Sequence, residues 1–420
     1  LVVAPAKGER IRRIFDKWEI PCRDIGRVIS DPVARIVEED KTIAQVPIRH
    51  LSDAPKYRLK GVPSEDQARR QRLSLSEVSL PSVSPEEVLL RLLGAPNIAS
   101  KEGVYRQYDH QVQTNTVVGP GSDAALLRLR GTDRAIALSI DGNGRYCYLD
   151  PFRGGQIAVA EVCRNLSCSG AEPMALTDCL NFGDPEKPEV YYQLEWCIRG
   201  MARACRVLGV PVVSGNVSLY NESRGQAIHP TPVLGGLGLL EDIARYAQSA
   251  FPGDGLTVAL LGDVGSRPRS SDLAGSEYLQ VFHGKIEGRP AIDLDMERKL
   301  QALCRLAIRY GILASAHDCA EGGLAVALAE CSVQGGVGFV GEFSLPQRWD
   351  AALFGERQSR IVVSLAENDW TALQRLADES GVPIRRLGTT GGDRFRVNRQ
   401  IDLPLQEISG AWREGLERAL

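Results

Sequence analysis

The sequence lacks an excess of charge of either sign, a long apolar run and a regular cysteine motif. Lys and Arg total 50 and Asp and Glu total 53, so the formal net charge is -3. A balance this close to neutral excludes a generic nucleic-acid binder. No apolar run reaches about 18 residues, which argues against a membrane-spanning helix. With 43% hydrophobic and 25% charged residues, the composition is that of a soluble globular protein.

Several catalytic and binding signatures are also absent. The 10 cysteines form no CxxC pair, and Cys163, Cys197 and Cys205 lie in helical apolar stripes. We therefore expect reduced thiols of a cytoplasmic protein rather than disulfides or zinc ligands. The five histidines show no metal-ligand spacing, and the chain has no GxSxG elbow, no P-loop and no GxGxxG after a strand. No cysteine has the context of a nucleophile, which argues against a glutaminase or protease.

Glycine is abundant instead, and predicted strands alternate with helices. The chain has 42 glycines in 420 residues, against about 7% in an average protein. The apolar patterns predict strands over 124–131, 134–141, 173–178, 210–215, 258–263 and 312–317, and helices over 154–170, 189–209, 296–311 and 322–332. This order indicates an α/β protein with two neighbouring α/β layers.

The first residues of the chain resemble its end. Residues 20–28 (IPCRDIGRV) match residues 382–390 (VPIRRLGTT), and in both copies a predicted helix precedes and a strand pair follows. A strand is also expected at IGRVI, residues 25–29. We therefore expect residues 1–53 to be the tail of a first-half C-terminal domain whose upstream part is missing. A small N-terminal subdomain is the alternative.

The remaining boundaries follow from composition and helix signals. Residues 54–83 are charged and Ser-rich, and Ser84, Pro85 and Glu87 predict a capping box at the start of a helix. We therefore expect a linker and helix over 54–97, one α/β domain over 98–250 and a second over 251–420.

Polar residues recur where the predicted strands stop. Asp141 and Asp178 each end an apolar strand, Asp318 follows one, and Asn216 and Ser218 follow another. Each residue type also favours turns, but four such strand ends in one chain favour a ligand site at the edge of the sheet.

The types of side chain indicate the ligand. Carboxylate and amide oxygens without thiolates suit Mg²⁺. Glu161 and Asn165 lie four residues apart on one helix face in an otherwise apolar stretch, where a carboxylate is costly unless paired or metal-bound. Gly-Gly turns expected at the starts of two helices, residues 154–155 and 322–323, could offer backbone N–H groups to phosphate.

Five segments resemble one family of enzymes. They are YDHQVQTNTVVGPGSDAA, DGNGRYCYLDP, ALTDCLNFGDPEKPEV, PVVSGNVSLYNE and AHDCAEGGLAVALAE, and they are similar to phosphoribosylformylglycinamidine synthase, in the synthetase subunit of the small multi-subunit form. This family belongs to the aminoimidazole ribonucleotide synthetase-like superfamily. The resemblance implies that members of the family are built from two homologous halves, each with an N-terminal and a C-terminal α/β domain. The resemblance implies ATP-dependent amidine formation from formylglycinamide ribonucleotide and ammonia in purine biosynthesis.

The resemblance also implies roles for individual residues. Asp178 and Gly215 match ATP contacts, Asn216 a Mg²⁺ ligand and Ser218 a substrate contact. Four further residues match ligands of the magnesium at a second, auxiliary nucleotide site: Asp141, Glu161, Asn165 and Asp318. Where the family usually reads Ser-Asp-Gly-Gly, this chain has Ala320-Glu321-Gly322-Gly323, so a nucleotide contact at that second site is put in question.

The resemblance further implies what this chain does not supply. The catalytic His of the family lies in the first half, so no catalytic residue is assigned here. Ammonia would come from a separate glutaminase subunit, with a small bridging subunit completing the assembly. The alternative function is a non-catalytic, nucleotide-binding structural half. A kinase of the same superfamily is disfavoured by the NFGDPEKPEV and SGNVSLYNE segments.

Overall fold

The computed structural model describes residues 1–53, 56–57, 59–262 and 267–420, and the chain divides into two compact units, Leu1–Arg58 and Leu59–Leu420. Residues 54, 55 and 58 of the predicted linker and Asp263 of a predicted strand lie outside the described residues. No helix in the described part of the chain is both long and apolar enough to cross a membrane.

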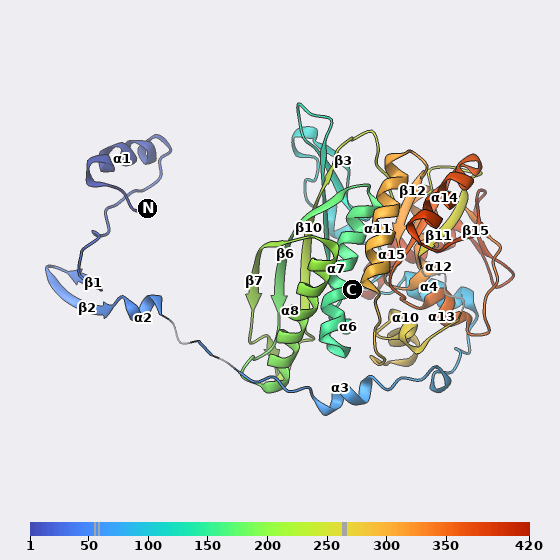
Figure 1. Ribbon diagram of the computed structural model, residues 1–420, viewed down its shortest axis with the longest axis horizontal. Coiled ribbons are helices and arrows are strands. Elements are labelled where there is room, and N and C mark those ends of the chain that lie inside the picture. The colour runs from blue at the N-terminus through green and yellow to red at the C-terminus, as the bar shows by residue number, and fades with distance from the viewer. Residues whose placement is uncertain (54–55, 58, 263–266) are drawn as a thin grey trace. The chain divides into compact units, whose positions relative to one another are not determined.

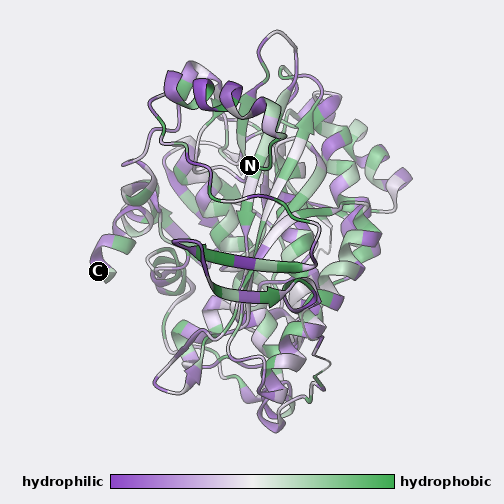
Figure 2. Ribbon diagram, turned by 90° about the vertical axis from the view of Figure 1, so that its left-hand side faces the viewer, coloured by the Kyte–Doolittle hydropathy of each residue, from purple (hydrophilic) through white to green (hydrophobic). Residues whose placement is uncertain are grey.

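The first unit contains two α-helices and a hairpin. It contains α1 (Gly8–Lys17), the antiparallel pair β1 (Val33–Glu38) and β2 (Lys41–Pro47), and α2 (Arg49–Ser52). Hydrophobic residues recur along both hairpin strands (Figure 2), yet none of the unit's described residues is buried. The strand expected over 25–29 is wrong, because this segment is irregular and its Ile25 and Val28 side chains are exposed. A strand needs a hydrogen-bonding neighbour, and this segment pairs with none in the described part of the unit.

The second unit begins with an extended segment that packs on the domains behind it. It contains α3 (Glu65–Arg70), where Gln67 Nε2 donates to the Leu149 carbonyl at 3.2 Å and the Gly288 N–H donates to the Arg70 carbonyl at 2.8 Å. Leu149 belongs to the first α/β layer, and Gly288 belongs to the second. Within the second unit, the part of the predicted linker around α3 therefore packs against both α/β layers.

The helix predicted after the linker is α4 (Pro85–Leu93). Ser84 caps it as expected, with its Oγ accepting from the Glu87 N–H at 3.3 Å. The other half of the capping box is wrong, since the Glu87 carboxylate pairs with Arg91 at 2.7 Å one turn further along the helix.

The first α/β layer contains a six-stranded sheet. Its strand order is β3 (Thr116–Val118), β4 (Ala125–Arg128), β5 (Ala135–Asp141), β10 (Thr231–Leu240), β6 (Glu172–Asn181) and β7 (Val212–Ser218). All pairs are antiparallel except β6–β7. The associated helices are α5 (Glu102–Tyr105), α6 (Gly144–Leu149), α7 (Pro151–Cys168) and α8 (Pro188–Leu208), and a small hairpin joins β8 (Glu222–Ser223) to β9 (Gln226–Ala227).

Among the described residues of the second unit, helices cover only one face of this sheet. Helices α7 and α8 lie against it (Figure 1), and along β5 the buried Ala135 and Ala137 alternate with the exposed Leu138 and Ile140. Met174 of β6 and Leu237 of β10 are also exposed. A sheet with an apolar open face is typical of a surface that another element covers.

Glycines bring α7 and α8 together. A Cβ on Gly155 would lie 2.4 Å from the Cys197 carbonyl oxygen, and one on Gly200 would lie 2.0 Å from the Phe152 carbonyl oxygen. Helix α7 begins at Pro151, so the glycines at 154–155 lie inside it and the phosphate-binding turn expected there is wrong. At the second Gly-Gly pair Gly322 does cap a helix, but its N–H already donates to Glu356 at 2.9 Å.

The second α/β layer contains a seven-stranded sheet. Its order is β12 (Ser315–Asp318), β14 (Arg360–Leu365), β11 (Thr257–Gly262), β15 (Ile384–Thr390), β13 (Phe339–Gly341), β16 (Arg394–Val397) and β17 (Ile401–Pro404). The helices are α9 (Ser270–Leu273), α10 (Glu277–His283), α11 (Leu294–Arg309), α12 (Gly323–Gly335), α13 (Trp349–Phe354), α14 (Trp370–Ser380) and α15 (Leu405–Ala419). Every residue of β11 and β14 is buried, so both faces of this sheet are covered. The predicted α/β class and its two layers are confirmed.

The cysteines are all free. Cys163 and Cys197 are buried in the core, as the helical stripes predict, and Cys205 is half-buried.

Candidate functional site

A single cross-strand row in the first sheet contains three of the predicted site residues. Leu234 of β10 pairs with Asp141 of β5 on one side and with Asp178 of β6 on the other, and Asp178 pairs with Gly215 of β7. Paired residues point to the same face, and Leu234 is fully buried, so the row lies on the helix-covered face. At about 4.8 Å between strands, Asp141 and Asp178 are about 10 Å apart along it.

Gly215 and Asp178 are direct cross-strand partners in the β6–β7 pair. A Cβ at Gly215 would lie 1.9 Å from Asp178 Oδ1, and burial raises the pKa of Asp178. The expectation that one strand ends at Asp178 and the next at Gly215 is wrong. Strand β6 continues past Asp178 to Asn181, and β7 contains both Gly215 and Asn216. The site residues are therefore held by ladder hydrogen bonds near the sheet edge.

Asn216 and Ser218 lie on the other face of β7. Asn216 pairs with Cys179 and Ser218 with Asn181, which alternate with Asp178 along the strands. The Ser218 Oγ donates to Asn221 Oδ1 at 3.2 Å. Because β7 is the exposed edge strand, a ligand at this edge can reach residues of both faces.

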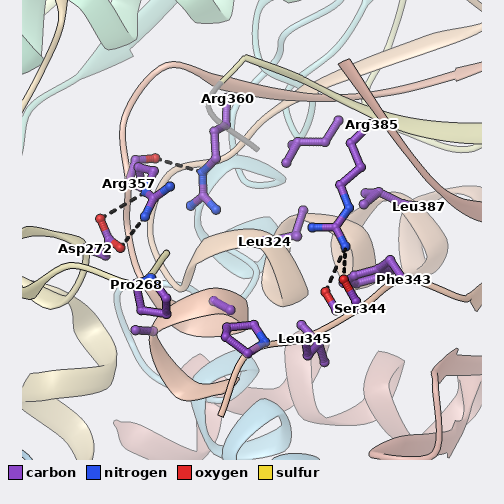
Figure 3. A pocket seen from close by; sticks show the side chains of 14 residues that line it. Pro268, Asp272, Leu324, Phe343, Ser344, Leu345, Arg357, Arg360, Arg385 and Leu387 are labelled. Atoms are coloured by element: carbon purple, nitrogen blue, oxygen red, sulfur yellow. Dashed lines mark hydrogen bonds and ion pairs between the residues drawn. The ribbon is translucent and has the colours of Figure 1, made fainter. Parts of the chain in front are cut away.

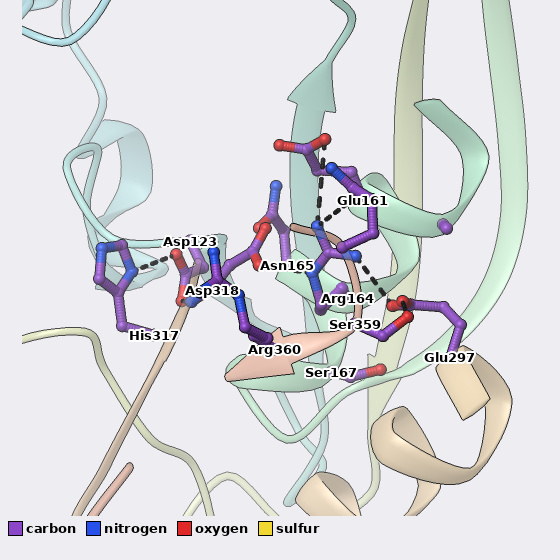
Figure 4. Close-up of polar contacts among 12 residues, drawn as sticks. Asp123, Glu161, Arg164, Asn165, Ser167, Glu297, His317, Asp318, Ser359 and Arg360 are labelled. Carbon is purple, nitrogen blue, oxygen red and sulfur yellow. Dashed lines mark hydrogen bonds and ion pairs between the residues drawn. The ribbon is translucent and has the colours of Figure 1, made fainter. Parts of the chain in front are cut away.

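The four residues predicted as auxiliary magnesium ligands converge between the two layers. Asp141 ends β5, Glu161 and Asn165 lie on α7, and Asp318 ends β12. Asn165 Nδ2 donates to Asp141 Oδ2 at 3.3 Å. The Arg164 guanidinium, between Glu161 and Asn165 in sequence, donates to Asp318 (Figure 4).

Burial and like charge perturb the carboxylates of this cluster. The pKa of Asp141 is raised to about 7 by burial and by the charges of Glu321 and Asp318. The pKa of Asp318 is raised to about 6 by burial, although Arg164 opposes the shift. Burial, with Asp141 and Glu321, raises the pKa of Glu161 well above its ordinary value. An additional cation would relieve this repulsion.

The donor types fit magnesium, but the positions are not those of an assembled site. Asp318 Oδ2 is buried without a hydrogen-bond partner and could accept a ligand. Among the residues that the structure describes, however, no three His, Cys, Asp or Glu side chains form a group that could hold a metal ion. The assignment of this cluster to magnesium stays a prediction.

Several residues of the cluster were missed by sequence reasoning. Arg164 and Glu297 are fully buried charges, and Glu297 lies 133 residues further along the chain. His317 lies between Asp123 and Glu330, with nitrogen–oxygen distances of 2.7 Å and 3.1 Å. Although burial disfavours its charged form, Asp123 raises the pKa of His317 well above its ordinary value. A charged residue within an apolar helix, the signal that singled out Glu161, could also have identified Arg164.

A small pocket of about 30 Å³ lies elsewhere, in the second layer (Figure 3). Its lining includes Leu324 and three arginines, and none of the predicted site residues. Asp272 holds the Arg357 side chain, and Arg385 donates to the Ser344 carbonyl at 2.8 Å. The arginines of this pocket are thus engaged by the fold.

Comparison with protein families agrees with this architecture. The N-terminal domain model of the AIR synthase related proteins matches residues 121–240, and the C-terminal domain model matches residues 253–399. The chain belongs to the AIR synthase related family. The two matched regions contain the first and the second sheet, respectively, almost in full.

Two relatives similar to this chain are phosphoribosylformylglycinamidine synthase subunits. The chain is 47% identical to phosphoribosylformylglycinamidine synthase subunit PurL of Moorella thermoacetica and 48% identical to that of Thermomicrobium roseum, each over 99% of this chain. It spans only 57% of the length of either relative.

Solved structures share the fold. Thermotoga maritima PurL complexed with ATP matches at a TM-score of 0.58 and 23% identity, over 93% of this chain and 54% of that one. The same protein complexed with FGAR matches at a TM-score of 0.60 and 16% identity, over 78% of this chain and 54% of that one.

Proposed function

We propose that this chain supplies part of the active site of an ATP-dependent C–N ligase. In this reaction formylglycinamide ribonucleotide and ammonia give formylglycinamidine ribonucleotide, in purine biosynthesis. The observation that carries the proposal is the 47–48% identity to PurL subunits over 99% of this chain. The ten free thiols support a reducing, cytoplasmic location.

The proposed chemistry is a phosphoryl transfer followed by substitution. The formyl amide oxygen attacks the γ-phosphorus of ATP and ADP leaves, and ammonia then adds to the activated carbon and expels phosphate. Asp178 and Gly215 would contact ATP, Asn216 would contribute an oxygen ligand to Mg²⁺, and Ser218 would contact the substrate. Magnesium neutralises phosphate charge in such transfers. The residues of β7 would then position the reactants at the sheet edge.

The proposal includes partners. A homologous first half, carrying the catalytic His, would complete the site, and the open apolar face around Ile140, Met174 and Leu237 supports such a covering element. A glutaminase subunit would supply ammonia, with a small bridging subunit between them. No glutaminase signature occurs in this chain, which agrees with ammonia from another subunit.

The test is complementation in trans. The chain is co-expressed with the N-terminal part of the Moorella thermoacetica relative that it does not cover, and ADP release is measured with formylglycinamide ribonucleotide and ammonium chloride. We expect turnover only from the pair, and its loss in Asp178→Asn. Robust amidine formation by the chain alone would contradict the proposal that it supplies only part of the active site. If Asp178→Asn leaves turnover of the pair intact while Asp141→Ala lowers its melting temperature, the non-catalytic structural reading is correct instead.

A further inference from the structure

The Asn221 side chain joins the ends of the two strands that carry the proposed site. It lies three residues beyond the end of β7, and its Nδ2 donates to the Phe182 carbonyl at 3.0 Å and to the Ser218 carbonyl at 2.9 Å. Phe182 directly follows β6, and Ser218 is the last residue of β7. The Asn221 Oδ1 accepts from Ser218 Oγ at 3.2 Å. One amide thus engages both the backbone and the hydroxyl of the residue proposed to contact the substrate.

The chemistry of these groups fixes the direction of each hydrogen bond. Carbonyl oxygens only accept, so the amide nitrogen of Asn221 faces the two carbonyls and its oxygen faces Ser218. The opposite orientation would place Oδ1 against two acceptors. Because Oδ1 carries no proton, the Ser218 hydroxyl donates to it. The single hydroxyl proton of Ser218 is therefore used within the protein, and toward a ligand its oxygen is left to accept.

Backbone hydrogen bonds hold this turn in place. The Phe182 N–H donates to the Ser218 carbonyl at 3.0 Å, and the Asn221 N–H donates to the Phe182 carbonyl at 3.1 Å. Tyr220 lies between them in the left-handed region, with a φ of 61°. This conformation costs free energy for a bulky residue and persists where the surrounding contacts fix it. The Ser218 hydroxyl, half-buried at an exposed sheet edge, is therefore held in one direction.

We infer that Asn221 is a positioning residue that makes Ser218 a hydrogen-bond acceptor toward the substrate. The inference rests on the proposed function, in which Ser218 contacts formylglycinamide ribonucleotide. The donors of this substrate are its ribose hydroxyls and its amide N–H groups, whereas a phosphate monoester above its second pKa of about 6 offers acceptors alone. Ser218 therefore faces the ribose or amide part of the substrate and not its phosphate.

The first experiment measures KM for formylglycinamide ribonucleotide in the complemented pair of chains. Ser218→Ala should raise KM about fivefold, the usual loss for one hydrogen bond. Asn221→Ala should raise it at least about twofold, because the hydroxyl is then free to rotate. The double variant should show no further rise beyond Ser218→Ala, since both changes act on the same acceptor. A double variant whose KM rises by the product of the two single factors would overturn the inference.

Asn398→Ala is the matched control for stability. The Asn398 amide also binds a backbone segment, in the second layer: its Nδ2 donates to the Phe343 carbonyl at 2.8 Å, and its Oδ1 accepts from the Phe343 N–H at 3.0 Å. We expect this change to lower the melting temperature, as Asn221→Ala does, and to leave KM unchanged. If Asn398→Ala raises KM as much as Asn221→Ala, the effect is one of stability and the inference is wrong.

The second experiment identifies the group that Ser218 faces. Formylglycinamide 5′-deoxyriboside, which has neither the phosphate nor a 5′-hydroxyl, is measured as an inhibitor of the same pair at pH 8. Ser218→Ala should weaken its binding by the factor found for the nucleotide. A loss confined to the nucleotide would place Ser218 at the phosphate and overturn the inference. Nucleotides lacking the 2′- or the 3′-hydroxyl separate the two donors: the effect of Ser218→Ala disappears with one of them if a ribose hydroxyl donates, and persists with both if an amide N–H does.

Failure of the proposed function would be seen separately. A wild-type pair without turnover would contradict the proposed function as a whole, and an unchanged KM in Ser218→Ala would contradict the role that it gives Ser218; the inference would fall with either. Turnover with a KM that depends on Ser218 but not on Asn221 would leave the proposed function standing and overturn this inference alone.

Discussion

Gly215 faces the Asp178 carboxylate across the β6–β7 pair so closely that a methyl group on its Cα would lie 1.9 Å from Asp178 Oδ1. The backbone of Gly215 is not in the left-handed region, so the requirement for glycine here is steric. The absence of a side chain leaves room beside the carboxylate at an exposed sheet edge, which is where a nucleotide contact is proposed.

Gly215→Ala should therefore impair the proposed reaction more than the fold. The added methyl group displaces the Asp178 carboxylate, and a displacement of about 1 Å at a reacting site can lower the rate about 100-fold. We expect a loss of this order in kcat/KM for ATP of the complemented synthetase, with little change in melting temperature because β7 is an exposed edge strand. The matched control is Gly253→Ala, where the new Cβ meets no atom within 4 Å. Equal activity of both variants would contradict the role of Gly215.

Gly200→Ala should destabilise the first layer. Its Cβ would lie 2.0 Å from the Phe152 carbonyl oxygen, so α7 and α8 must separate, and overpacking of this kind costs about 1–3 kcal/mol. The comparison is Gly410→Ala in the middle of α15, whose Cβ meets open space. That change should stabilise the protein by about 0.5–1 kcal/mol, since alanine favours helix. Urea unfolding of both variants measures the difference, and the prediction fails if the two changes have the same sign.

Glu356 should make the stability of the protein depend on pH. Burial raises the pKa of this carboxyl from 4.5 to about 7, although Arg145 opposes the shift. Between these two values the folded state keeps a proton that the unfolded state has lost, so stability decreases as pH rises from about 4.5 to about 7. The loss is about 3 kcal/mol, at 1.36 kcal/mol per unit.

The measurement is the free energy of unfolding at several pH values between 5 and 8. Glu356→Gln should reduce the decrease by about 3 kcal/mol, because its amide cannot ionise while its oxygen can still accept from the Gly322 and Glu277 N–H groups. The buried carboxyls of Asp141, Asp318 and Glu161, whose pKa values are also raised, cause the rest of the decrease. Glu417→Gln, an exposed change on α15, should behave as wild type. A Glu356→Gln protein with an unchanged pH profile would show that other groups cause the dependence.

The thiols should differ in reactivity according to burial. Seven of the ten free cysteines are buried, while Cys22, Cys179 and Cys205 are half-buried. Burial also raises the pKa of Cys205, which lowers its thiolate fraction. Titration with Ellman's reagent should therefore modify at most three thiols in the native protein and ten after unfolding. Rapid reaction of more than three native thiols would contradict this packing.

Much of the second unit could be predicted because its elements have strong local signals. The α8 stripe ends at Gly209, which adopts the left-handed conformation expected beyond a helix C-terminus. Ser84 caps α4 through a contact within one turn. The ends of β6 and β7 could not be predicted, since pairing with β10 and with each other extends them through polar residues. The strand expected over 25–29 failed for the opposite reason, because no neighbour pairs with it in the described part of its unit.

The sequence by itself determined the fold class, the order of the elements and the residue types at the proposed site, because apolar periodicity, caps and motifs are local properties of the chain. Only the tertiary structure decided which of these residues meet. It aligned Asp141, Leu234, Asp178 and Gly215 in one row, and placed Asn216 and Ser218 on the opposite face. It also brought Glu297 to Arg164 across 133 residues. Sheet register and the burial of charge are set by contacts between distant segments, and a local sequence pattern does not predict such contacts.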